Sequence, residues 1–103
     1  MNIESLVNEV HQATDFQINK KILREKIQTD LHMAHSGGLF KITPELIAFV
    51  KTWPIDELYI EDAYQNPIAI DRQVFLVTAQ QHYQQVMNRW HNEYEQLKKI
   101  RKV

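Results

Sequence analysis

Two histidines lie three residues apart, a spacing that metal sites use. His32 and His35 enclose the dipeptide Met-Ala. On a helix this spacing places two imidazoles on one face, where they can ligate a metal ion. No third ligand is evident beside them, and imidazolium groups also favour the negative end of a helix, which the pair Gly37-Gly38 would terminate. The sequence therefore favours helix-end histidines, and we expect no metal and no cofactor.

Acidic residues gather between Lys51 and Arg72, where the sequence has no basic residue. They are Asp56, Glu57, Glu61 and Asp62, followed by Asp71. Paired carboxylates can perform acid/base catalysis or hold a divalent cation. A catalytic pair usually needs burial to separate its two pKa values, and an exposed hairpin offers little burial. We therefore interpret the cluster as a solvated face that discourages pairing at a sheet edge.

Basic residues form two patches, one in the first third of the chain and one at its end. The patches consist of Lys20, Lys21 and Arg24, and of Lys98, Lys99 and Arg101. If the patches met in space, they would form a face that contacts phosphates. The formal net charge is −1, however, whereas nucleic-acid-binding domains are usually strongly basic. A nucleic acid is thus the alternative partner, not the favoured one.

Catalytic motifs are absent from the sequence. It contains no Gly-rich phosphate loop, no Gly-x-Ser-x-Gly, no His-Glu-x-x-His and no cysteine, so we predict that the protein is not an enzyme. Its 103 residues suit a single domain, 1–103. No apolar run approaches the ~18 residues that cross a bilayer, and the N-terminus does not resemble a signal peptide. We expect a cytoplasmic protein with no membrane partner and identify no small-molecule substrate.

The spacing of apolar residues predicts a mainly α (α+β) fold. A first helix is expected over 2–12, and a second begins near residue 15, where Thr14 and Gln17 match a capping box. Gly37-Gly38 would end this second helix. The sequence Thr43-Pro44-Glu45 predicts the start of a third, which ends before Pro54. Alternating residues predict one β-hairpin near 57–70, and Asp71 would cap a long C-terminal helix, 72–102.

The long helix carries an apolar, aromatic stripe with a period of about seven residues. It comprises Leu76, Tyr83, Val86, Trp90, Tyr94, Leu97 and Ile100. At 1.5 Å per residue the helix is ~46 Å long, whereas a compact chain of this size is ~35 Å across. The apolar side chains on the protruding part of the helix need to be covered by another surface that shields them from water. That cover is either a helix of the same chain or a second copy, and the sequence leaves both open. We predict an interaction or assembly protein that acts through this stripe, with a protein partner or self-association as a homodimer.

Part of the chain resembles a known group of proteins. Gly37-Gly38-Leu-Phe, Thr43-Pro44-Glu-Leu-Ile, Asn66-Pro67-Ile and Met87-Asn-x-Trp-His-x-Glu-Tyr are similar to segments of small uncharacterised proteins encoded by T4-like phages of marine cyanobacteria. The resemblance covers 37–102. It implies a phage protein made in the cytoplasm of a bacterial host, and it implies no activity and no functional residue.

Overall fold

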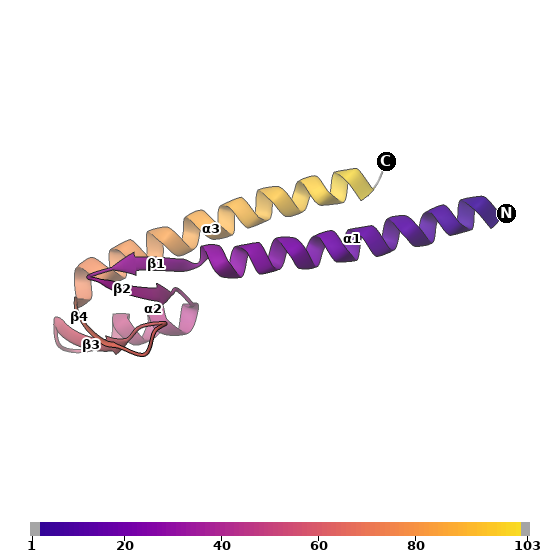
Figure 1. Cartoon of the computed structure of the whole chain (residues 1–103). Helices are drawn as coiled ribbons and strands as arrows, with labels where there is room; N and C mark the ends of the chain where they lie inside the picture. Colours follow the sequence, from indigo (N-terminus) through magenta and orange to yellow (C-terminus); the bar gives the residue numbers. More distant parts are fainter. Residues whose placement is uncertain (1–2, 102–103) are drawn as a thin grey trace.

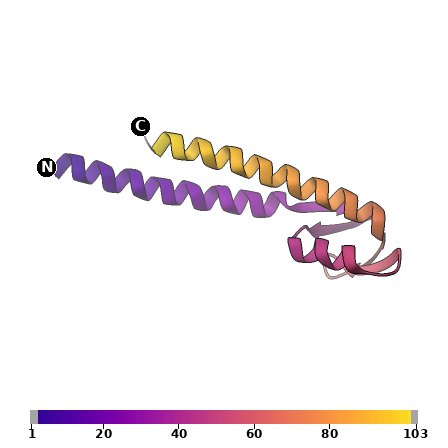
Figure 2. The same ribbon diagram turned by 180° about the vertical axis from the view of Figure 1, so that it is seen from behind.

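The computed structural model describes residues 3–101, and the backbone alone at Arg101. The molecule is elongated, with extents of 66 × 23 × 19 Å. Two long helices, α1 (Ile3–Asp30) and α3 (Arg72–Arg101), run antiparallel and form a stalk (Figures 1 and 2). The segment between them, together with the first turns of α3, forms a head. The protein is therefore mostly α-helical with a smaller β component, and the expected compact globule is not what the chain forms.

The helix α1 replaces the two helices predicted over 2–12 and from residue 15. Thr14 does not cap a helix, because its hydroxyl donates to the Val10 carbonyl oxygen at 2.9 Å, one turn back. This back-bond occupies the Thr14 side chain inside a continuous helix. No Gly or Pro interrupts the sequence before residue 37, so nothing in this stretch forces a break. The described residues thus contain three helices in total, not four.

The segment 32–41 is a β-hairpin, whereas the sequence analysis placed the part before Gly37 at the end of a helix. Strands β1 (His32–His35) and β2 (Gly38–Lys41) pair antiparallel, with Met33 opposite Phe40. The turn consists of Ser36 and Gly37, whose φ angles are 50° and 84°. A two-residue turn with positive φ at both positions matches the twist of a hairpin, and Gly adopts that angle without strain. Gly37 therefore turns a hairpin and does not end a helix.

The remaining elements agree with the sequence analysis. Helix α2 (Pro44–Thr52) begins after Thr43, whose hydroxyl accepts from the Leu46 amide at 3.1 Å. Strands β3 (Glu57–Glu61) and β4 (Pro67–Asp71) form the predicted hairpin. The Asp71 carboxylate accepts from the Val74 amide at 3.0 Å and so caps α3. The expected helix end at residue 102 lies outside the described residues.

The head encloses the larger of two hydrophobic cores. Phe40 from β2 and Phe75 from α3 meet edge to face, with ring centroids 5.2 Å apart. Both side chains are fully buried, together with Ile42 and Val50. Residues from β1, β2, α2, β3, β4 and α3 contribute to this core. Because β1, β2, α2 and β4 pack against one side of its first turns, α3 is anchored to the head at the point where it enters the stalk.

The stalk has a narrower core along the line where α1 meets α3. It contains the buried residues Leu23, Ile27, Leu31 and Val86. Polar contacts fasten the end of α1 near the head: the His82 ring nitrogen Nε2 donates to the Asp30 carbonyl oxygen at 2.8 Å, and Arg89 pairs with the Asp30 carboxylate at 3.2 Å. Farther out, Lys26 pairs with Glu93 at 3.2 Å, which explains why a charged residue interrupts the apolar stripe of α3.

Candidate docking groove

The predicted stripe on α3 divides into three zones. Leu76 packs on the head core, and Tyr83 contacts both cores. Val86 is 1% exposed, covered by α1 of the same chain. Trp90, Tyr94 and Leu97 form the next zone, packed against α1 but only partly buried, and Ile100 at the end is 71% exposed. An intramolecular cover thus protects the inner part of the stripe and leaves the outer part half open.

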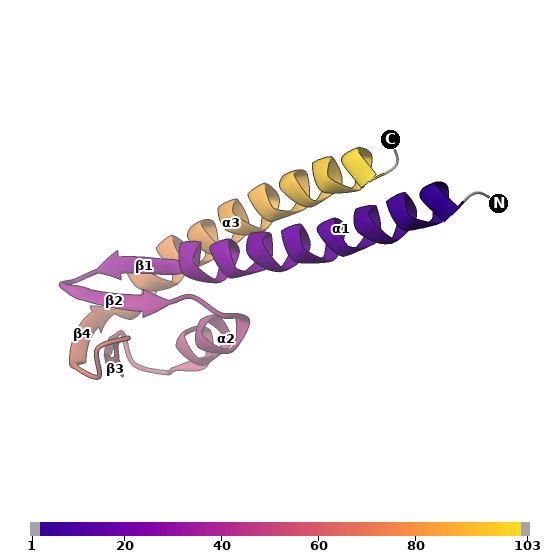
Figure 3. The ribbon, with the colours of Figure 1, turned by 45° about the vertical axis from the view of Figure 1, so that its right-hand side comes forward.

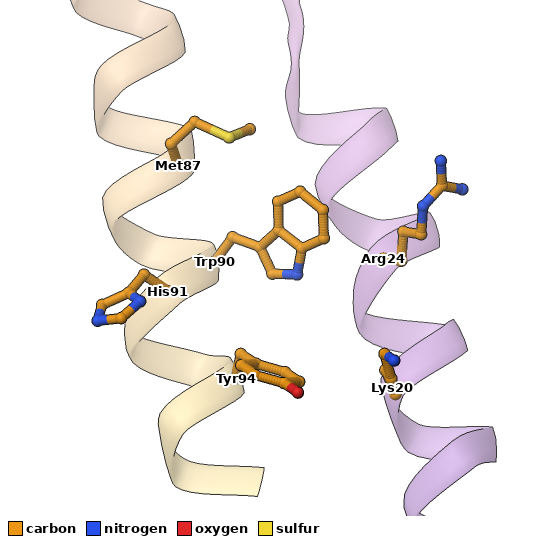
Figure 4. A pocket seen from close by; sticks show the side chains of 6 residues that line it. All are labelled: Lys20, Arg24, Met87, Trp90, His91 and Tyr94. Carbon is orange, nitrogen blue, oxygen red and sulfur yellow. The ribbon is translucent and has the colours of Figure 1, made fainter. Parts of the chain in front are cut away.

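A groove runs along one side of the stalk where this cover is incomplete. Figure 4 shows Met87, Trp90 and Tyr94 reaching from α3 toward α1, while Lys20 and Arg24 form the opposite wall. The groove encloses about 290 Å³ and its surface is almost entirely apolar. It exists because a pair of helices meets along one line only, so large aromatic side chains on that line extend beyond the cover a single neighbour provides.

Positive charge surrounds this apolar floor. Lys20 and Arg24 line the groove and carry this charge, and the exposed His91 lines it as well. Lys98 follows His91 by seven residues on α3, and its ammonium lies 5.4 Å from the centroid of the Tyr94 ring. Glu95 accepts a hydrogen bond from Lys98 at 2.9 Å and raises the pKa of that ammonium above its ordinary value, so Lys98 keeps its charge at neutral pH. The arrangement suits an apolar partner that carries negative charge.

The six basic residues predicted to contact nucleic acid are only partly brought together. Lys20, Arg24 and Lys98 lie around the same groove. Lys21 and Lys99 are exposed, but they do not line it. The side chain of Arg101 lies outside the described part of the structure. The structure therefore joins half of the predicted set on one side of the stalk, which sequence spacing alone did not show.

His32 and His35 do not share a helix face, because both lie on β1. In a strand, residues three apart point to opposite sides of the sheet. His32 contacts the Thr29 carbonyl oxygen at 3.0 Å, and His35 packs edge to face on Phe75 with centroids 5.2 Å apart. Among residues 3–100, no group of three or more His, Asp or Glu side chains is placed to hold a metal ion.

Two acidic residues of the middle segment, Asp56 and Asp62, have structural partners. Asp56 pairs with Arg72 at 3.3 Å. Asp62, expected on a solvated face, is 7% exposed, and its carboxylate accepts from the backbone amides of Leu39, Tyr64 and Asn66 at 2.9–3.1 Å. These bonds, that of Asn66 foremost, lower the pKa of Asp62. An Asp that begins a turn before Asn-Pro is a signal for such bonding that the sequence analysis missed.

No protein-family model, no curated protein and no solved structure matches this chain. The resemblance to phage proteins therefore stays a prediction. None of the helices within residues 3–101 combines the length and apolar character that crossing a bilayer demands. The geometry of the stalk supplies the evidence for a function.

Proposed function

We propose that this chain is a small, non-enzymatic interaction or assembly protein that binds a partner through the aromatic stripe of α3, with self-association as a homodimer the simplest case. One observation carries this proposal: Trp90 and Tyr94 remain partly exposed over an apolar groove after α1 has packed against them. Partly buried aromatic residues with a basic rim are typical centres of protein interfaces.

The head supports this role by fixing the stalk. It buries the first turns of α3 in a core of two hairpins and α2, and it joins α1 to that core through β1. The two helices therefore leave the head in a defined orientation. A rigid pair of helices presents the groove without a large ordering cost on binding.

Light scattering over a range of concentrations tests the proposal. We expect the mass to rise toward that of a dimer in the high micromolar range. The double variant Trp90→Glu/Leu97→Glu should abolish self-association or partner binding, because it places charge in the apolar contact. Gln85→Glu/Asn92→Glu adds the same two charges at exposed positions of α3 that do not line the groove, and it is the matched control.

The head must remain folded for this result to count. Amide hydrogen exchange of β1–β2 and β3–β4 should be the same in the wild type and in both variants, because the head core contains neither Trp90 nor Leu97. Mass and binding that are unchanged in Trp90→Glu/Leu97→Glu would contradict the proposal.

A nucleic-acid accessory role is the second candidate. The observation that favours it is the position of Lys20, Arg24 and Lys98 around exposed aromatic surface, since single-stranded nucleic acids stack on aromatic rings between basic groups. This role predicts retention on a single-stranded DNA or RNA column that falls steeply as salt rises. Retention that Arg24→Ala and Lys98→Ala leave unchanged would remove this candidate.

A further inference from the structure

The first turns of α1 extend beyond the end of α3 and carry their own apolar stripe. Figures 1 and 3 show α1 continuing past the last described turn of α3. A hollow near the end of α3 is lined by Gln12 and Ile100, and α1 continues beyond it toward the N-terminus. In this overhang, 3–11, the exposed apolar residues are Ile3, Leu6, Val7 and Val10.

Two residues of this stripe, Leu6 and Val10, lie on the same side of α1 as the groove. Leu6 precedes Lys20 by 14 residues, and Val10 precedes Arg24 by 14 residues. Fourteen residues are close to four turns of an α-helix, so each pair points in nearly the same direction. The stripe of the overhang is thus continuous with the groove wall that Lys20 and Arg24 form.

The overhang and the groove are complementary in charge and in length. Residues 1–19 contain Glu4, Glu9 and Asp15 but no Lys or Arg. The groove has Lys20, Arg24 and Lys98 at its edges. Ile3 and Val10 are seven residues apart, as are Met87 and Tyr94, so the stripe and the floor of the groove each span about two helical turns. The overhang of α1 is therefore apolar and acidic, which are the properties that the apolar, basic groove requires of a partner.

From this match we infer that the groove receives the α1 overhang of a second copy of this chain. The inference rests on the proposed function and names its partner. The two α1 helices run antiparallel about a two-fold axis, so each copy places its overhang in the groove of the other. Residues whose numbers sum to about 29 then lie opposite one another, which brings Glu9 of each copy beside Lys20 of the other. Such an interface is closed and self-complementary.

Two other arrangements fit the structure less well. A parallel pair would place acidic overhang against acidic overhang and Lys20 against Lys20. Contact between the two overhangs alone would be only about 13 Å long. In the antiparallel arrangement, residues 3–26 of the two copies lie side by side over about 36 Å. A contact of this length and a width of two helix diameters buries on the order of 700 Å² per copy, close to the ~800 Å² of a stable interface.

Substitutions in the overhang test this arrangement without touching the groove. Leu6→Glu/Val10→Glu should weaken self-association at least ~100-fold by light scattering, because two charges would enter an apolar contact. Ile22→Glu is the control: Ile22 is 58% exposed and Val10 56%, but Ile22 points about 160° away from both Lys20 and Arg24 around α1. The control should self-associate like the wild type.

A charge exchange tests the register. Glu9→Lys and Lys20→Glu should each weaken self-association about twofold to fivefold per ion pair, because like charges then face each other in both copies of the contact. Mixing the two variants should give a heterodimer with wild-type affinity, since each of its two contacts then joins one acidic and one basic side chain. Failure of the mixed sample to recover would overturn this register.

Cross-linking distinguishes the orientations, and the absence of cysteine makes it clean. Ala13→Cys lies near the two-fold axis, about 4.5 Å along the helix from its equivalent in the other copy, so a short bismaleimide should link the pair. Ile3→Cys lies about 35 Å along the helix from its equivalent and should not link. Linking at position 3 instead of 13 would overturn the antiparallel arrangement.

The outcomes separate this inference from the proposed function. A wild-type chain that stays monomeric in the high micromolar range overturns the inference. A dimer that survives Leu6→Glu/Val10→Glu but dissociates in Trp90→Glu/Leu97→Glu also overturns the inference, while the proposed function stands. A dimer that dissociates in both variants and survives Ile22→Glu supports both.

Discussion

The head and the stalk share one helix but enclose it to different degrees. In the head, one face of α3 packs against two hairpins and α2, and Phe75 is completely buried, while Val74 and Val77 on the other side stay exposed. In the stalk, the same helix has α1 as its single neighbour, and Trp90, Tyr94 and Leu97 stay partly exposed. A helix face covered by several elements secures the fold, whereas a helix face covered by a single neighbour leaves side chains partly exposed. The comparison places structural constraint in the head and the proposed docking surface in the stalk.

The largest expected effect is the loss of an aromatic side chain from the head. Phe75→Ala should lower the free energy of unfolding by about 3–5 kcal/mol, because it removes a fully buried ring in edge-to-face contact with Phe40 and His35. Urea denaturation followed by circular dichroism measures this change. A loss below about 1 kcal/mol would mean that the head core is not closely packed.

A truncation in the stalk core should be less costly and should act locally. Ile27→Ala removes a buried side chain between α1 and α3, and we expect a loss of about 2–3 kcal/mol, the lower part of the usual range, because a two-helix contact can close over a cavity. Amide exchange should accelerate in α1 and change little in β3–β4. Equal acceleration in both regions would show that head and stalk unfold as one unit.

Gly38 in the head should tolerate a side chain less well than its neighbour Gly37 in the turn. A Cβ atom at Gly38 would lie 2.8 Å from Cγ1 of Ile68 and 3.1 Å from the Phe40 ring. Gly38→Ala should therefore cost about 1–3 kcal/mol by forcing the core apart. Gly37→Ala has open space around it and should cost about 1 kcal/mol through its positive φ alone. Equal costs in the same denaturation experiment would contradict this account.

The carboxylate of Asp62 should make the stability of the head depend on pH in the acid range. Its pKa in the folded protein lies below the ordinary 3.8, so its contribution is fully present above that value and is lost as pH falls through the folded pKa. Asp62→Asn should be less stable than the wild type at neutral pH, and the difference should shrink below about pH 3.8. A difference that stays constant across that range would contradict the role of the charge.

The smallest effect is expected at the exposed ion pair across the stalk. Lys26→Ala should change the free energy of unfolding by less than about 1 kcal/mol, because both partners are accessible to water. A double-mutant cycle with Glu93→Ala measures the coupling. Coupling well above about 1 kcal/mol would mean that the stalk depends on charges and not on the apolar line between its helices.

Local signals in the sequence predicted those elements whose ends are encoded nearby. Thr43-Pro44 and Asp71 mark helix starts that depend on two or three adjacent residues, and the structure confirms both. The hairpin over 57–70 follows from alternation around Asn66-Pro67 and is also confirmed. In each case the stabilising contact lies within a few residues, where propensity and capping operate.

The predictions that were wrong came from sequence motifs that fit two different local structures. Thr14 with Gln17 fits a capping box, but a continuous helix uses the Thr14 hydroxyl for a bond one turn back. Gly37 fits a helix end and a hairpin turn equally well in sequence. Whether this segment forms a helix end or a hairpin depends on tertiary packing, because Met33 and Phe40 reach the core from the two paired strands. The groove combines α1 and α3 residues far apart in sequence, so spacing within one helix did not reveal it.

The mass of the wild-type chain in solution, measured by light scattering over a concentration series, tests the central claim most directly. The half-covered stripe of α3 predicts a mass that rises with concentration toward twice that of the 103-residue chain, whereas Trp90→Glu/Leu97→Glu should keep the mass of one chain. A wild-type mass that stays at one chain throughout, with no binding lost in that variant, would contradict the claim that the stalk is a docking surface.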